Sequence, residues 1–236
     1  MIDVVRRWKY MVFLLFFGIS TSWAQGRYLP GDVVPEPYLK VFGYERFFKV
    51  SAISEPIKAL MDSCSMRQNG PVSWDDLRYL QVLHFDDDGN AIIGELVCNV
   101  LISKDLMEIF KALFEVGYPI EKMRLIDHYG CDDEVSMLDN NTSCFNQRPI
   151  TAGGRISKHS YGLAIDINPK YNPNYKVKTS GMAVVKPETS TDYLDRSADF
   201  PYKITKGDLC YRLFKQHGFQ WGGEWASGKD YQHFEK

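Results

Sequence analysis

The chain has 236 residues and a formal net charge of -2 at pH 7, with 44% hydrophobic and 25% charged residues. This length suits one domain with a substantial core and is short for two. A mildly acidic chain without a lysine-rich run gives no reason to expect nucleic acid as a partner.

Residues 1–24 have the pattern of a cleavable signal peptide. Basic residues precede an almost unbroken apolar run at 10–19, and Ser22 and Ala24 are small residues at the positions that a signal peptidase reads. The run is shorter than the roughly 20 residues of a membrane-spanning helix, so an uncleaved anchor is the weaker alternative. We expect a periplasmic or secreted protein with no stable membrane span after cleavage.

The next part of the chain predicts an extended lead-in followed by a hairpin. Residues 26–37 are rich in Gly and Pro and look extended. Residues 73–76 have the form of a capped helix start. Strand formers at 79–85 and 91–100 flank the acidic turn at 86–90, which indicates two antiparallel strands.

The second half predicts helices and further strands. Ser103 is expected to cap a helix that ends near Val116, with apolar residues recurring at the spacing of one buried face. Residues 119–128 look like a strand. Asp208 resembles the start of another capped helix, which ends before Gly218.

Three histidines are expected to be structural. His217 follows the predicted C-terminal helix, where its charge interacts well with the helix dipole. His84 and His128 lie in strand-like segments without a partner at ligand spacing.

Five cysteines are present and none forms a Cys-x-x-Cys pair, which argues against a zinc site built from cysteine. Export permits disulfides. A bond between Cys131 and Cys144 would staple the loop between them, but the sequence does not choose among the pairings. Because the number is odd, at least one thiol should stay free or pair between chains.

Two stretches carry residues for metal chemistry. His159 and Asp166 lie in the first, and Asp230 and His233 in the second. Zinc favours imidazole nitrogen and carboxylate oxygen, and a hydrolytic site uses three protein ligands so that water can take the fourth position. We expect His159, Asp166 and His233 to be the ligands. Asp230 is then available as the general base, which indicates a zinc hydrolase.

Strand geometry supports this grouping. Residues 163–167 read as a buried strand in which Asp166 points away from the leucine and isoleucine layer. Gly162 makes the preceding turn tight enough to bring His159 near. Asp230 and His233 are an odd number of residues apart, so a turn or bulge between them is needed for both to face one point.

The motifs resemble the zinc-dependent peptidoglycan peptidases: D-alanyl-D-alanine carboxypeptidases, the dipeptidases of vancomycin resistance and L-alanyl-D-glutamate endopeptidases. The resemblance rests on Ser157, His159, Gly162, Ala164, Asp166, Trp221-Gly-Gly-x-Trp225 and Asp230-x-x-His233-Phe-Glu235. It implies an α+β fold shared with the Hedgehog signalling domain, with a small, mostly antiparallel sheet backed by helices. It also implies zinc as cofactor and a peptidoglycan stem peptide as substrate. We expect a catalytic region at 101–236 and an N-terminal extension and hairpin, packed on it, at 25–100.

The resemblance also implies substrate-binding residues. The family places an arginine upstream of the metal histidine to stabilise charge on the scissile carbonyl oxygen, and Arg148 is the candidate, with Arg155 as competitor. Ser157 resembles the family serine that binds substrate, although it also suits the cap of a turn. Trp221 and Trp225 are expected to line the cleft or to pack beside it.

Because of two departures from the family pattern, the sequence does not identify which peptide bond is cut. Asp230 stands where many of the carboxypeptidases have glutamate, which resembles the endopeptidase branch instead. Residues 169–201 lack periodicity and form either a cleft-side loop that selects the peptide or a surface insertion. The alternative function is a non-catalytic, zinc-containing module for wall binding or signalling.

Overall fold

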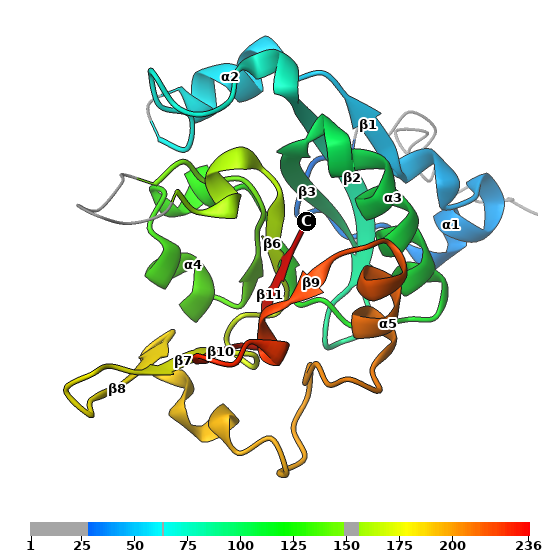
Figure 1. The fold of residues 1–236 in the computed structure, drawn as a ribbon. Helices are drawn as coiled ribbons and strands as arrows, with labels where there is room; N and C mark the ends of the chain where they lie inside the picture. Colours follow the sequence, from blue (N-terminus) through cyan, green and yellow to red (C-terminus); the bar gives the residue numbers. More distant parts are fainter. Residues whose placement is uncertain (1–27, 63, 149–155) are drawn as a thin grey trace, which may run out of the picture.

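Within the part of the chain that the structure describes, three antiparallel sheets of three strands and one parallel strand pair form the framework (Figure 1). This computed structural model describes residues 28–62, 64–148 and 156–236. The expected signal peptide lies outside these residues. Helices pack on the sheets around a main hydrophobic core, so the predicted single α+β domain is confirmed.

The N-terminal sheet has the order β1–β2–β3. Strands β2 (Leu77–Phe85) and β3 (Ala91–Asn99) form the predicted hairpin, and β1 (Lys49–Ser51) pairs with β2. Side chains alternate along a strand, and Leu80 and Val82 face the main core. The opposite face is covered by segments that lie mostly N-terminal to the hairpin.

Short helices make up much of that cover. They are α1 (Glu36–Phe42), η2 (Glu45–Phe47), α2 (Glu55–Met61) and η3 (Trp74–Asp76). The predicted cap is present at η3, where Ser73 and Asp76 form a capping box. The helix lasts a single turn because β2 begins directly after it.

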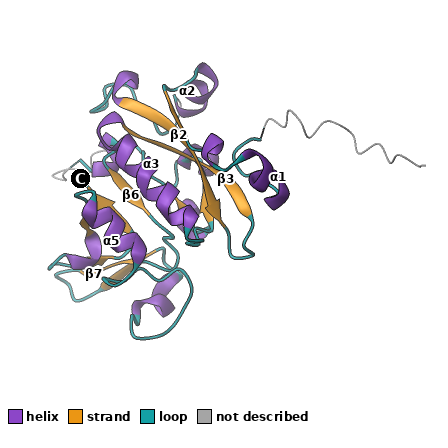
Figure 2. Ribbon diagram, turned by 90° about the vertical axis from the view of Figure 1, so that its right-hand side faces the viewer, coloured by secondary structure: helices purple, strands orange, loops and turns teal. Residues whose placement is uncertain are grey.

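Helix α3 (Val100–Glu115) packs against β2 and α5 (Figure 2). Its predicted apolar face is buried as expected. The predicted start at Ser103 is wrong by one turn: the side chain of Asn99 accepts a hydrogen bond from the Leu101 N–H and caps the helix. Ser103 instead donates its hydroxyl to the Val100 carbonyl. The predicted strand at 91–100 also included Val100, which is the first residue of the helix.

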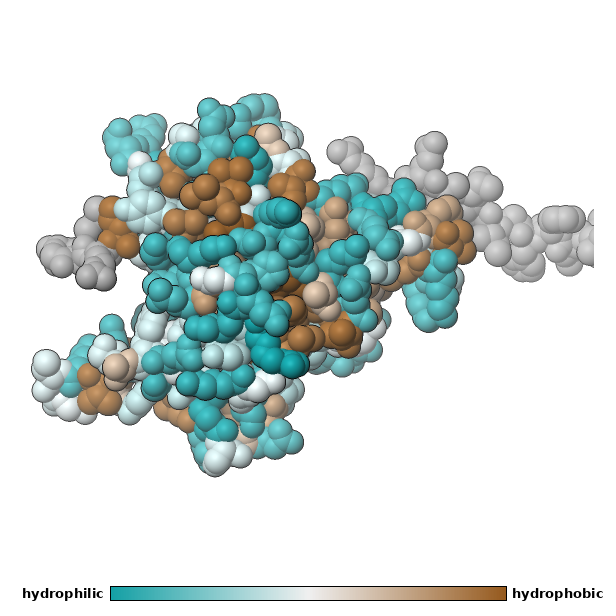
Figure 3. Space-filling view, turned by 45° about the vertical axis from the view of Figure 1, so that its right-hand side comes forward, coloured by the Kyte–Doolittle hydropathy of each residue, from teal (hydrophilic) through white to brown (hydrophobic). Residues whose placement is uncertain are grey.

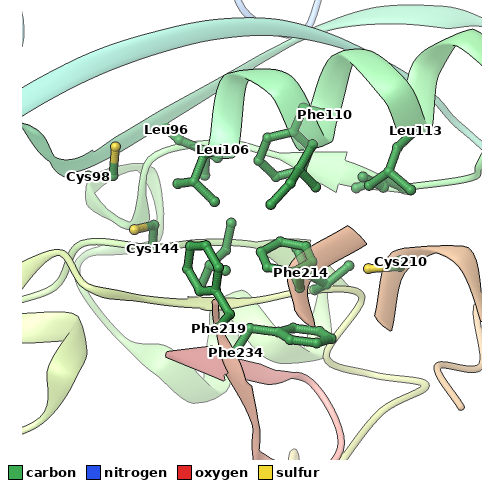
Figure 4. Packing of buried hydrophobic residues seen from close by; sticks show 14 of the residues in the cluster. Leu96, Cys98, Leu106, Phe110, Leu113, Cys144, Cys210, Phe214, Phe219 and Phe234 are labelled. Atoms are coloured by element: carbon green, nitrogen blue, oxygen red, sulfur yellow. The ribbon is translucent and has the colours of Figure 1, made fainter. Parts of the chain in front are cut away.

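Helix α5 (Leu209–Gln216) begins where the sequence predicts. Asp208 caps it by accepting from the Cys210 N–H. The core between α3 and the C-terminal strands contains Phe110, Phe214 and Phe234, all fully buried (Figure 4). Phe214 and Phe234 stack at 4.3 Å between ring centroids, which ties α5 to the strand that carries the predicted metal ligand His233.

The predicted strand at 119–128 is mostly wrong. Its one strand is β4 (Lys122–Met123), which pairs in parallel with β5 (Asn141–Thr142), and Pro119 forms a single parallel bridge with Phe85. The chain then enters η4 (Ile126–Tyr129), followed by α4 (Asp133–Leu138). Asp127 accepts hydrogen bonds from the N–H and hydroxyl of Ser65, so a tertiary contact outweighs the local strand propensity.

The disulfide also differs from the pairing considered from the sequence. Cys131 pairs with Cys64, at a sequence separation of 67 residues, and not with Cys144. Cys98, Cys144 and Cys210 are free and buried. The bond therefore links the N-terminal segment to the segment between η4 and α4, and the local spacing of the cysteines does not reveal it.

Two small sheets carry the motifs of interest. One has the order β6–β11–β9, made of β6 (Ala164–Asp166), β11 (His233–Glu235) and β9 (Gln220–Trp221). Asp166 and His233 are direct partners in its register. The turns η5 (Lys158–Tyr161) and η7 (Gly222–Glu224) flank this sheet.

The other sheet has the order β10–β7–β8 and includes strands from the segment 169–201. The strands β7 (Asn174–Val177) and β8 (Ala183–Lys186) belong to this segment, and η6 (Ser190–Leu194) follows them. The third strand, β10 (Lys229–Asp230), comes from near the C-terminus. The part-buried guanidinium of Arg196 anchors this segment. It donates to carbonyls of Tyr171, Tyr193 and Ile204 and to the side chain of Asn172.

Among the described residues, no helix combines the length and apolar character that crossing a membrane requires. The face drawn in Figure 3 is largely hydrophilic, with hydrophobic side chains in separate areas. Exposed apolar residues such as Val41 and Leu101 lie in different helices.

Candidate metal centre

Three elements bring the predicted ligands together: η5 carries His159, β6 carries Asp166 and β11 carries His233. Gly162 ends η5 with a φ of +67°. A Cβ at this glycine would lie 2.7 Å from the backbone nitrogen of Asn99. Both the left-handed conformation and the close approach favour glycine here, and the resulting turn leads directly from His159 into β6.

The ligand atoms of these three residues all lie within 4.8 Å of one another. Nε2 of His159 is 3.2 Å from Oδ2 of Asp166, and Nδ1 of His233 is 3.0 Å from Oδ1 of the same carboxylate. All three side chains are buried. Two imidazoles and one carboxylate converging on one point are a donor set that fits zinc.

A second contact fixes each imidazole. Nδ1 of His159 lies 2.6 Å from the Cys144 carbonyl oxygen, and Nε2 of His233 lies 3.1 Å from a carboxylate oxygen of Glu235. Each of these nitrogens therefore carries a proton and donates it to the oxygen beside it. With a metal bound, the other nitrogen of each ring, which lies beside Asp166, would present its lone pair to the ion, as in metal-ligating histidines.

The charges of this group favour a cation. Burial raises the pKa of Asp166, but the charge of His159 and hydrogen bonds with both histidines outweigh it and hold the pKa well below its usual range. Burial lowers the pKa of His233, but hydrogen bonds with Asp166 and Glu235 outweigh it and raise the pKa to about 10. Both pKa shifts show that the carboxylates stabilise positive charge at this point. A bound metal ion would supply such a charge.

Asp230 lies in β10, next to the three predicted ligands, and is also buried. Its Oδ2 accepts a hydrogen bond from the Asn174 amide at 2.5 Å. Its Oδ1 is buried and accepts no hydrogen bond from any residue that the structure describes. Burial, and then the charge of Asp166, raise the pKa of Asp230 to about 6. A buried carboxylate oxygen without a partner has the properties of a proton acceptor.

The predicted turn between Asp230 and His233 is present. The chain bends at residues 231–232 and passes from one small sheet to the other, so both side chains line one cavity. Gly222 allows this approach, since a Cβ there would lie 2.6 Å from the Asp230 carbonyl oxygen. The odd spacing in the sequence is therefore resolved by a change of sheet.

The cavity around this group has a volume of about 840 Å³. Ser157 lines it and also accepts a hydrogen bond from the His159 N–H at 3.3 Å, so it caps η5 as well. Arg148 lines it too, with Nε 2.7 Å from the Asp133 carboxylate. Arg155 lies outside the described residues.

The two tryptophans have different positions. Trp225 lines the cavity, whereas Trp221 is buried in the core and donates its indole N–H to the Tyr231 carbonyl. The sequence reasoning treated the two alike. Trp221 instead packs between the sheet and α5, where it contacts Tyr211.

Sequence reasoning assigned no role to two residues of this centre, Asn174 and Glu235. Glu235 is two residues after His233 in the same strand, and this spacing places both side chains on one face. The alternation therefore held a usable signal. Asn174 faces Asp230 through strand pairing between distant segments, which no local pattern indicates.

Other clusters of possible metal ligands do not compete with this centre. Cys64 and Cys131 lie beside Asp127, but their sulfurs form the disulfide. The acidic group at 86–88 occupies the predicted turn between β2 and β3. The expected structural histidines have protein partners, including the Ile120 carbonyl for His84.

Comparison with known proteins supports the motif assignment. Residues 151–236 match the model of a family described as D-alanyl-D-alanine carboxypeptidase. Searches of curated proteins and of solved structures gave no match. The family match confirms the resemblance to the zinc peptidases of peptidoglycan and covers all three predicted ligands and Asp230.

Proposed function

We propose that this chain, whose residues 151–236 match the D-alanyl-D-alanine carboxypeptidase family of zinc peptidases, hydrolyses amide bonds in the stem peptides of peptidoglycan. Export by the expected signal peptide fits this substrate, because peptidoglycan lies outside the cytoplasmic membrane. The periplasm or the extracellular space is therefore the proposed location.

One observation carries the proposal: Asp230, whose buried Oδ1 has no partner among the described residues, lines the same cavity as the three converging ligands. A purely structural metal site is usually closed by four protein ligands. Here three donors are accompanied by a free, buried carboxylate oxygen. Keeping such an oxygen buried costs stability, which favours a role in proton transfer over a role in folding.

His159, Asp166 and His233 are the proposed zinc ligands. When bound, zinc supplies a Lewis acid that polarises the scissile carbonyl and lowers the pKa of water in the site. Asp230 takes a proton from the attacking water through Oδ1 and returns it to the leaving amine. Asn174 keeps Oδ2 occupied, so the other oxygen carries the proton.

Arg148 and Ser157 are the proposed substrate-binding residues. Both line the cavity, and the pairing of Arg148 with Asp133 holds the guanidinium at the cavity wall. From there it stabilises the negative charge that develops on the carbonyl oxygen. The Ser157 hydroxyl is placed to donate a hydrogen bond to the peptide.

The test uses purified protein and muropeptides of defined structure, with and without a chelator, and reads the products by mass. Loss of a terminal D-alanine identifies a carboxypeptidase, and cleavage after L-alanine identifies an endopeptidase. Chelation should abolish either reaction and zinc should restore it. No product in the presence of zinc would contradict the proposal and favour a non-catalytic binding module.

A further inference from the structure

The hairpin formed by β7 and β8 presents one face to the cavity of the metal centre. Asn174, the first residue of β7, reaches Asp230 and so fixes which face points inward. Side chains two residues apart share a face of a strand, so Lys176 lies on the same side, and Lys178 comes directly after the end of β7. Both line the cavity, whereas Tyr175 and Val177 between them do not.

Strand β8 contributes to the same face. Lys186 is the direct partner of Asn174, and Val184 is the partner of Lys176. Direct partners in an antiparallel pair point to the same side, and both of these β8 residues line the cavity. The register therefore places Lys176 and Lys186 on the inner face of the hairpin, with Asn174 at its base. Lys178, one residue beyond the end of β7, lines the same cavity.

These lysines have few anionic partners. Lys186 lies 3.6 Å from Glu134, and its side chain is 53% exposed. Lys176 and Lys178 are exposed and form no ion pair with any residue that the structure describes. The nearby acidic residues of the cavity are held in the metal centre or by Arg148. The inner face of the hairpin is thus positively charged and open to a ligand.

We propose that Lys176 and Lys178 bind free carboxylates of the peptide substrate, so that the enzyme selects acidic stem peptides over amidated ones. This inference rests on the proposed function and names its substrate class. Side chains two residues apart in a strand are spaced by about 7 Å, which suits carboxylates on different residues of an extended peptide. In Figure 1 the hairpin projects from the body of the protein beside β10, and its inner face lines the cavity.

The strength of such contacts is set by solvent exposure. Each exposed ion pair contributes modestly and is weakened by salt. Two such pairs together should give roughly a tenfold preference for an acidic peptide at low ionic strength. The preference should appear mainly in KM, because these lysines lie along the strand from the reacting group and do not contact it.

The test compares two peptides of the same length, one with free side-chain carboxylates and one with those groups amidated. Wild type should cleave the acidic peptide with about tenfold higher kcat/KM. The double variant Lys176→Gln/Lys178→Gln should lose this preference and keep its activity on the amidated peptide. The control Lys40→Gln/Lys104→Gln removes the same charge from exposed positions in α1 and α3 and should retain the preference.

The outcomes separate this inference from the proposed function. Hydrolysis of both peptides with the same ratio in wild type and in the Lys176/Lys178 variant would overturn the lysine role and leave the peptidase intact. If neither peptide is cleaved, the proposed function fails. Calorimetric binding of the same two peptides then decides the lysine role: a preference that the variant loses supports it, and equal binding overturns it.

Discussion

The amide of Asn174 donates a hydrogen bond to Oδ2 of Asp230 and leaves Oδ1 of that carboxylate without a partner among the described residues. The two residues are direct partners in the β7–β10 register. Asn174 belongs to the segment 169–201, which has no periodicity in the sequence. That segment therefore supplies a wall of the cavity and orients the proposed base.

Replacing Asn174 by alanine should reduce kcat about tenfold while zinc content stays unchanged, because the base loses its orientation. The hydrogen bond from Asn174 lowers the pKa of Asp230. Its loss should therefore move the acid limb of the kcat/KM profile to higher pH. Asn90→Ala, in the turn before β3, is the matched control. An unchanged profile in Asn174→Ala would contradict a positioning role.

Glu235 holds the His233 ring through Nε2. Removing the carboxylate in Glu235→Ala should weaken zinc binding about 10- to 100-fold, the usual effect of losing the partner of a metal-ligating histidine. Competition with a chromophoric chelator measures this directly. Glu224→Ala removes a carboxylate that pairs with Lys206 and Lys215 away from the centre. Equal affinity in the two variants would show that Glu235 does not orient the ligand.

His84 should make stability depend on pH. Burial lowers the pKa of this histidine from 6.5 to about 4. Between these values the unfolded chain takes up a proton that the folded protein excludes, so stability falls as pH decreases from 6.5 to 4. The full loss is about 3 kcal/mol. Urea unfolding at pH values across this range should show a smaller decrease in the free energy of unfolding for His84→Phe than for wild type. Parallel plots of that free energy against pH would refute the assignment.

The disulfide between Cys64 and Cys131 closes a loop with a sequence separation of 67 residues. Loop-closure entropy predicts a loss of about 4 kcal/mol in the double variant Cys64→Ala/Cys131→Ala. Denaturant unfolding with and without a reductant measures the effect. The reductant should destabilise wild type and leave the double variant unchanged, whereas equal sensitivity in both proteins would exclude this pairing.

Local patterns predicted much of the fold. The β2–β3 hairpin, the buried face of α3 and the Asp208 cap of α5 follow from periodicity and capping residues. The start of α3 was missed because residues 100–102 are apolar and suit the end of a strand as well as the start of a helix. The segment at 119–128 read as a strand, but the contact between Asp127 and Ser65 is tertiary and leaves no local signal.

In the candidate site, too, local patterns predict some residues and only tertiary contacts reveal the others. His159, Asp166, Asp230 and His233 stand out by residue type and spacing, and the fold brings them together. The contact of Asn174 with Asp230 depends on strand pairing across 56 residues. The lysines face inward because of the register of the β7–β8 pair, and register decides which side chains share a face. Trp221 and Trp225 have similar local contexts, and only packing separates the core residue from the cavity residue.

The most direct test of the account is the activity of zinc-loaded Asp230→Asn on muropeptides. Asparagine keeps the size of the side chain and its contact with Asn174 but cannot accept the proton. Metal analysis should find zinc at the wild-type ratio, while kcat/KM falls by about 10²- to 10⁴-fold. Wild-type activity in the zinc-loaded variant would contradict the assignment of Asp230 as the base, and with it the proposed hydrolytic centre.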